Sequence, residues 1–97
     1  MNRKRQPTHP GGVLRRHYIE PLNLTISVLA DNLHVSRKTV SKIVNERGSI
    51  TPDMALRLSK AFETSAELWL NLQTNYDLWN AVSKSKEWES VKPLVSA

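Results

Sequence analysis

Helix-capping side chains constrain the fold of this chain more than any other sequence feature. Four hydroxyl residues each stand directly before a stretch in which apolar residues recur at helical spacing: Thr25, Ser36, Thr51 and Thr64. A hydroxyl at this position accepts a hydrogen bond from a free N–H group of the first helical turn. The T-x-x-E spacing from Thr64 to Glu67 is that of a capping box. These residues predict the starts of four helices.

A fifth helix is expected before these four. It begins near Pro10 and ends before Pro21, because a proline inside a helix loses a hydrogen bond and clashes with the preceding turn. The four capped helices are expected over residues 26–33, 37–45, 52–62 and 67–82. The sequence shows neither the alternation typical of strands nor an internal repeat. We therefore predict an all-α fold, a compact domain of five helices.

The length of 97 residues predicts a single domain. We expect residues 1–8 to form a flexible basic arm, residues 9–82 the helical domain with a long fifth helix, and residues 83–97 a tail. The absence of cysteine excludes disulfides and thiolate zinc sites, and no apolar run approaches the roughly 18 residues of a transmembrane helix. These features predict a cytoplasmic protein without a membrane segment, bound metal or cofactor.

The positive charge is concentrated in the first half of the chain. Residues 1–47 contain nine Lys or Arg and three acidic residues, a net charge of +6, whereas residues 48–97 have a net charge of −1. A basic surface confined to one region is the electrostatic signature expected of a nucleic-acid-binding protein.

The sequence LADNLHVSRKTVSKIVN, residues 29–45, has the pattern of a helix-turn-helix. Ala30 is small enough for a steep helix crossing, and the chain is expected to reverse at His34. Glycine is the usual residue at such a turn, and histidine is one of the few other residues enriched in the left-handed region. Val40 and Ile43 would then fix the second helix on the first. The polar residues left facing outward are Ser36, Arg37, Lys38, Thr39, Ser41 and Lys42.

Donors of this kind contact phosphates and base edges in the major groove, so we predict that these six residues bind double-stranded DNA. Thr25 and Ser27 could hold a phosphate at the start of the preceding helix, or serve only in capping. Arg47 in the following turn is a further phosphate candidate. For the basic residues at 3–5, contact with DNA and no specific role both remain open.

An aromatic stripe runs along the predicted fifth helix. Trp69 and Leu72 are expected in the core, and Tyr76 and Trp79 are expected at a dimer interface farther along the helix. A two-fold dimer would place its recognition helices about 34 Å apart, one turn of DNA. Trp88 is left without an assignment.

Catalysis is not expected of this chain. Its three histidines, His9, His17 and His34, are scattered, and no H-x-x-x-H pair, G-x-S-x-G sequence or phosphate-binding glycine loop accompanies them.

The segments HPGGVLRRHYIEPLNLT and ITPDMALRLSKAFETSAELWLNLQTNYDLW, on either side of the helix-turn-helix, resemble the HigA/VapI-type antitoxins of the Xre (lambda-repressor-like) superfamily. The resemblance covers about residues 9–79. It implies a homodimer that binds an operator, represses its own operon, and neutralises a HigB-like toxin of the RelE fold. Two alternatives remain open: a solitary Xre-type regulator without a toxin, and an all-α adaptor that never contacts DNA.

Overall fold

A computed structural model describes residues 5–96 of the chain. Its elements are α1 (Pro10–Leu14), a π-helical continuation (Arg15–Ile19), α2 (Ile26–Leu33), α3 (Arg37–Val44), α4 (Pro52–Phe62), α5 (Ala66–Lys84) and a 3-10 helix (Glu87–Ser90). Within residues 5–96 there is no strand. The predicted all-α fold of five helices is therefore confirmed, with α1 and its π-helical continuation as the first helix.

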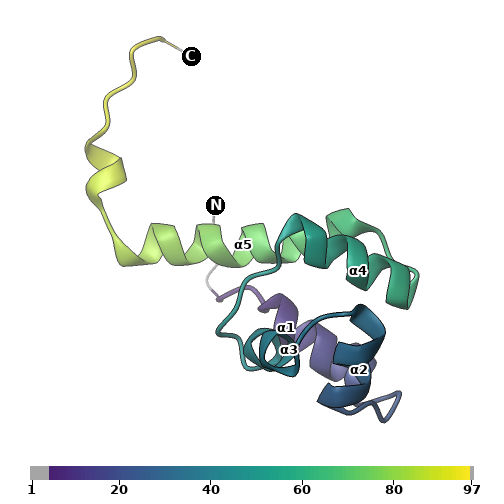
Figure 1. Cartoon of the computed structure of the whole chain (residues 1–97). Coiled ribbons are helices and arrows are strands. Elements are labelled where there is room, and N and C mark those ends of the chain that lie inside the picture. The colour runs from purple at the N-terminus through teal and green to yellow at the C-terminus, as the bar shows by residue number, and fades with distance from the viewer. Residues whose placement is uncertain (1–4, 97) are drawn as a thin grey trace.

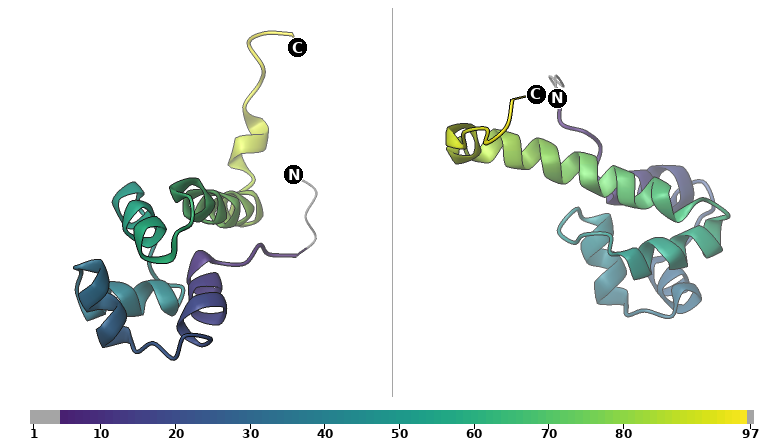
Figure 2. Two further views of the ribbon diagram at one scale, coloured as in Figure 1. Left: turned by 90° about the vertical axis from the view of Figure 1, so that its right-hand side faces the viewer. Right: turned by 90° about the horizontal axis from the view of Figure 1, so that it is seen from above.

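The five helices form two layers (Figures 1 and 2). Helices α1, α2 and α3 make up one layer, in which α3 packs against both α1 and α2. Helices α4 and α5 pack on each other and form the second layer. The C-terminal half of α5 extends beyond this bundle, which gives the molecule its elongated dimensions of 51 × 22 × 21 Å.

Three of the four predicted caps are confirmed. The hydroxyl oxygens of Thr25, Ser36 and Thr51 accept hydrogen bonds from the N–H group three residues farther along the chain, at 3.0, 3.1 and 3.2 Å. These bonds fix the starts of α2, α3 and α4, and they explain why local sequence located these helices.

The cap predicted at Thr64 is wrong by one residue. Ser65 caps α5 and accepts from the N–H of Leu68 at 3.1 Å. The hydroxyl of Thr64 instead accepts a hydrogen bond from Nε1 of Trp69 at 2.7 Å. The indole N–H needs a partner because Trp69 is fully buried. Glu67 still lies in the first turn, where its charge is favourable to the helix dipole.

The core is shared by all five helices. Trp69 lies completely buried at its centre, and Leu72 packs against it, as the aromatic stripe predicts. The other most fully buried apolar side chains come from every part of the bundle: Leu14, Leu29, Ala30, Val40, Ala55 and Leu58. Through this core α3 packs against α1 and α2, and α2 packs against α4.

Two local features differ from the sequence expectations. The first helix loosens into π-helical hydrogen bonding, in which the N–H of Glu20 donates to Arg15, and the chain reverses over residues 20–23. The turn that follows α3 begins before Arg47, because Glu46 is in the left-handed region with φ 62°. The N–H groups of Arg47 and Gly48 both donate to the carbonyl of Lys42, which closes the end of α3.

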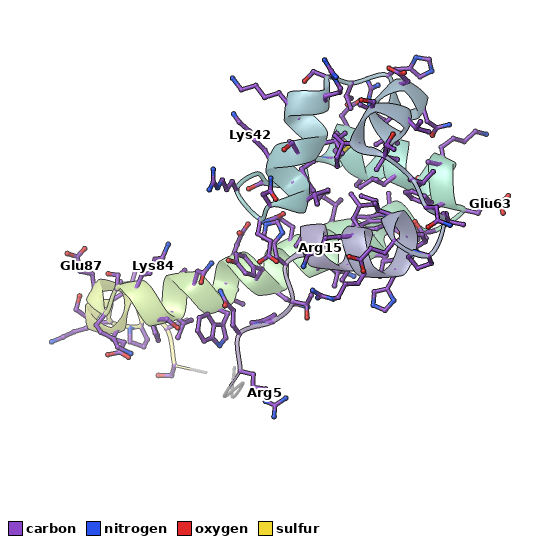
Figure 3. The ribbon with its side chains drawn as sticks, turned by 90° about the horizontal axis from the view of Figure 1, so that it is seen from below. Arg5, Arg15, Lys42, Glu63, Lys84 and Glu87 are labelled. Atoms are coloured by element: carbon purple, nitrogen blue, oxygen red, sulfur yellow. The ribbon has the colours of Figure 1, made fainter. Side chains whose placement is uncertain are left out.

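The first and last described residues, near 5 and 96, lie along or beyond α5. Pro7 is buried, and Gln6 donates to Asn80 of α5 at 3.4 Å. The predicted arm residues Arg3 and Lys4 lie outside the described residues, whereas Arg5 is exposed on the side of α5 away from Lys42 (Figure 3). Helix α5 continues two residues past the expected boundary at 82. Among residues 5–96, no helix has the length and apolarity needed to cross a bilayer.

Candidate nucleic-acid interface

The turn between α2 and α3 has helix-turn-helix geometry. His34 ends α2 in the left-handed region, with φ 59° and ψ 44°, as expected. The N–H groups of His34 and Val35 donate back to the last turn of α2, to Asp31 at 3.3 Å and Ala30 at 3.0 Å. Ala30 is also almost fully buried at the helix crossing, as its size predicts. This turn fixes the direction in which α3 leaves α2.

His34 is the one residue of this turn that adopts a conformation unfavourable for a β-carbon. Replacing it by glycine should raise the free energy of unfolding by about 0.5–1 kcal/mol. Glycine avoids the left-handed strain of about 1–2 kcal/mol, which exceeds the roughly 0.5–1 kcal/mol that its greater backbone entropy costs on folding. Thermal unfolding followed by circular dichroism measures the change. A lower melting temperature for His34→Gly would show that the imidazole contributes more than the backbone strain costs.

Helix α3 has one buried and one exposed face. Val40, Ile43 and Val44 are buried against the bundle. The polar residues predicted to face outward do so: Ser36, Arg37, Lys38, Thr39 and Lys42 are exposed and Ser41 is half-buried. The exposed face therefore presents three cations and several hydroxyls to solvent, away from the rest of the subunit (Figure 3).

The start of α2 lies beside the start of α3. A shallow surface groove runs between them, and its lining residues are Ile26, Ser27, Ser36, Arg37, Lys38 and Ser41. Thr25 is exposed at the cap of α2, so the free N–H groups at the N-terminus of this helix lie beside the groove. Arg47 is exposed in the turn that follows α3. Residues from both helices are thus brought to one basic surface that suits phosphate oxygens and base edges.

The hydroxyls on this surface form hydrogen bonds with neighbouring side chains. Ser36 and Thr39 share a hydrogen bond of 2.8 Å between their Oγ and Oγ1 atoms. The side-chain amide of Asn45 donates to the Oγ of Ser41 at 3.2 Å. Asn45 was not among the predicted contacts, although its four-residue spacing from Ser41 places both on one face of the helix.

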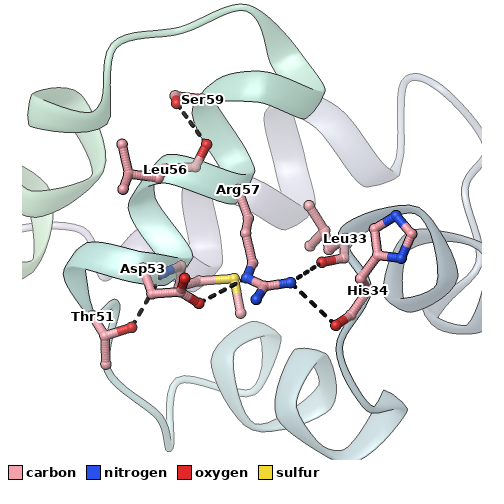
Figure 4. A network of polar contacts seen from close by, with 8 residues as sticks. Leu33, His34, Thr51, Asp53, Leu56, Arg57 and Ser59 are labelled. Atoms are coloured by element: carbon pink, nitrogen blue, oxygen red, sulfur yellow. Dashed lines mark hydrogen bonds and ion pairs between the residues drawn. The ribbon is translucent and has the colours of Figure 1, made fainter.

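Arg57 of α4 is a second residue that sequence reasoning did not single out. Its Nη1 donates to the backbone carbonyls of Leu33 and His34, at 2.7 and 3.2 Å (Figure 4). Its Nε donates to Asp53 at 2.7 Å in an i,i+4 ion pair. The Asp53–Arg57 spacing is visible in the sequence, but the carbonyl partners belong to another helix and are not.

Two buried polar side chains hold the loops around the bundle. Gln73 of α5 accepts a hydrogen bond from the N–H of Ile50 at 2.8 Å, which fixes the segment that leads into α4. His9 caps α1, because its Nδ1 accepts from the N–H of Gly11 at 2.9 Å. Gly11 in turn lies so close to α3 that a β-carbon there would overlap the carbonyl oxygen of Ile43.

The predicted dimer residues Tyr76 and Trp79 lie on α5, where both are half-buried. The ring of Tyr76 packs edge-on against His9, at 4.7 Å between ring centroids, so part of its surface is used within the subunit. Farther along, Leu78 and Trp88 are 46% and 50% exposed and line an apolar hollow with Val82. Sequence reasoning named neither of these two residues for the interface.

Comparison with known proteins places this geometry in a family. Residues 16–69, more than half of the chain, match the helix-turn-helix family. An uncharacterised HTH-type transcriptional regulator of Haemophilus influenzae is 47% identical over 94% of this chain and 88% of its own length. Antitoxin HigA-1 of Vibrio cholerae is 37% identical over 94% of this chain and 87% of its own. The structure of antitoxin GraA in complex with its operator superposes with a TM-score of 0.88 at 39% identity, over 99% of both chains. The chain therefore belongs to the helix-turn-helix family of transcriptional regulators, among relatives that include the HigA antitoxins.

Proposed function

We propose that this protein is a cytoplasmic transcriptional repressor that binds its own operator as a homodimer and acts as the antitoxin of a HigB-like toxin. The observation that carries the DNA-binding part is the exposed polar face of α3 beside the free N-terminus of α2. It has the shape and charge that a major groove accepts. The GraA–operator complex supports it, because that chain has the same fold over its whole length.

We assign the DNA contacts to the surface formed by α3, the start of α2 and the turn after α3. Arg37 and Lys38 suit guanine edges or phosphates, and Thr39 and Ser41 suit bases or backbone. The remaining contacts, to phosphates, are assigned to Thr25, Ser27, Ser36, Lys42 and Arg47. The N-terminal segment contacts α5 through Gln6 and His9 and passes to its other side. This argues against a DNA contact by Arg5 in the same subunit.

We assign the dimer interface to the half of α5 that extends beyond the bundle. Trp79 and Tyr76 lie at its start, and the exposed apolar side chains of Leu78 and Trp88 continue the same region. A two-fold axis there would leave both α3 helices free to enter successive major grooves about 34 Å apart.

The toxin partner distinguishes two candidate functions. The relatives named as antitoxins, such as HigA-1 of Vibrio cholerae, favour an antitoxin. The relative from Haemophilus influenzae, named only as a transcriptional regulator, favours a solitary regulator. Co-purification with the product of an adjacent reading frame for a small RelE-like protein would favour the antitoxin, and the absence of such a frame the solitary regulator.

A titration of the protein's own upstream DNA tests the proposed function. Fluorescence anisotropy should show saturation at two chains per operator. If Lys42, Arg47 and one of Arg37 and Lys38 each neutralise a phosphate, the dimer makes about six cationic contacts. The affinity should then fall by about a thousandfold between about 50 and 200 mM salt, because each of these contacts releases a counterion. Equal affinity for the operator and for an unrelated duplex would contradict a sequence-specific repressor.

A further inference from the structure

We infer that Arg57 is a positioning residue for DNA recognition: it fixes the turn from which α3 enters the major groove. The inference rests on the proposed function, but Arg57 is not one of the assigned DNA contacts. It belongs to α4, and its guanidinium group meets the turn at the C-terminal end of α2 (Figure 4).

The two carbonyls that Arg57 holds are at the last residue of α2 and at the left-handed residue after it. The C-terminal carbonyls of a helix lack partners within the helix and carry the negative end of its dipole. The guanidinium of Arg57 meets both requirements, since it donates to the oxygens of Leu33 and His34 and carries a positive charge. Two bonds from one Nη1 to successive carbonyls restrain the peptide plane between them.

Asp53 holds the other edge of the same guanidinium group. Its carboxylate accepts from Nε at 2.7 Å, one turn earlier on α4. Because the side chain of Asp53 is 71% exposed, this ion pair adds little stability by itself. Its effect is to orient the guanidinium plane, so that Nη1 points toward the turn.

Helix α4 is a firm support for this contact. Ala55 and Leu58, on either side of Arg57 along the helix, are completely buried in the core. Through Arg57, the position of His34 is therefore fixed relative to the core of the bundle. Two residues after His34 comes Ser36, the cap of α3, so a shift of the turn changes the direction of α3. Base contacts require closer positioning than phosphate contacts made by long cationic side chains.

The inference predicts a loss of specificity that exceeds any loss of general DNA affinity. Arg57→Met keeps much of the side-chain length but loses the donors. For each subunit of the bound dimer, the ratio of operator affinity to affinity for an unrelated duplex should fall about 5- to 150-fold, the effect of losing one base contact. The salt dependence of binding to the unrelated duplex should be unchanged. Anisotropy at a temperature where the variant is fully folded by circular dichroism measures both.

Lys60→Met is the matched control, because it removes the same charge from an exposed position on the same helix. It should leave the specificity ratio unchanged. Arg57→Lys keeps the charge but not the planar guanidinium, and should lose part of the specificity. It provides a second, milder test if Arg57→Met does not fold.

Three results would overturn the inference. An unchanged specificity ratio in Arg57→Met, with only a lower melting temperature, would leave Arg57 a purely stabilising role. An equal loss of affinity for both duplexes, with a salt slope lower by about one, would make Arg57 a direct phosphate contact. A ratio lowered equally by Lys60→Met would trace the effect to charge alone. If the unmutated protein itself does not prefer its operator over the unrelated duplex, that result contradicts the proposed function instead. Measuring the specificity ratio of the unmutated protein therefore separates the two failures.

Discussion

Replacing Arg37 and Lys38 together by alanine is expected to weaken binding to the protein's own operator by about 2–6 kcal/mol for each subunit of the bound dimer. Each lost base or phosphate contact costs about 1–3 kcal/mol, and both residues are exposed at the start of α3 beside the groove shared with α2. The free energy of unfolding should change little, because neither side chain is part of the core. Anisotropy at fixed salt and urea unfolding measure the two quantities.

A matched control removes the same charge elsewhere. Lys60 on α4 and Lys92 in the C-terminal segment are exposed outside α3, the start of α2 and the outer half of α5, and their joint replacement by alanine lowers the net charge equally. This variant should lose little operator affinity, since charges separated by more than about 10 Å from the DNA are largely screened. Unchanged binding after the loss of Arg37 and Lys38 would favour the adaptor that never contacts DNA. Equal losses in both variants would show that only the overall charge attracts the duplex.

The parts of the fold that sequence predicts are those determined by local chemistry. Thr25, Ser36 and Thr51 each accept a hydrogen bond from the N–H group three residues away, so the starts of their helices follow from short stretches of sequence. The outward face of α3 follows equally directly, because the buried positions of Val40 and Ile43 leave the other sides of the helix to solvent.

The parts that sequence does not predict depend on partners far along the chain. Thr64 has the pattern of a cap, but its hydroxyl accepts a hydrogen bond from the indole N–H of Trp69, and Ser65 caps the helix instead. The partners of Arg57 and Gln73 lie 23 or 24 residues away, on other segments. Periodicity identifies which residues face a core, but it gives no information about which backbone groups meet a given side chain there. The residues that support α3 were therefore less predictable than the exposed face of α3 itself.

Gly11→Ala is expected to lower the free energy of unfolding by about 3 kcal/mol or more. An added β-carbon would overlap the carbonyl oxygen of Ile43, and this oxygen belongs to the backbone of α3, which cannot rotate away as a side chain can. The overlap can be relieved only by separating α1 from α3, and overpacking of this kind costs about 1–3 kcal/mol, occasionally more. Urea unfolding followed by circular dichroism measures the loss.

Gly12→Ala separates this overlap from the general effect of alanine. The two glycines are neighbours in α1 and both are buried. At Gly12, however, the atoms nearest to the new β-carbon belong to the end of the Arg16 side chain, with Nη2 at 2.9 Å, and a flexible side chain moves at small cost. Since alanine favours helix by about 1 kcal/mol over glycine, Gly12→Ala should be neutral or slightly stabilising. Equal stabilities of the two variants would contradict direct packing of α1 on α3. If Gly11→Ala also loses operator specificity while still folded, the same close approach that stabilises the bundle holds the recognition helix in position.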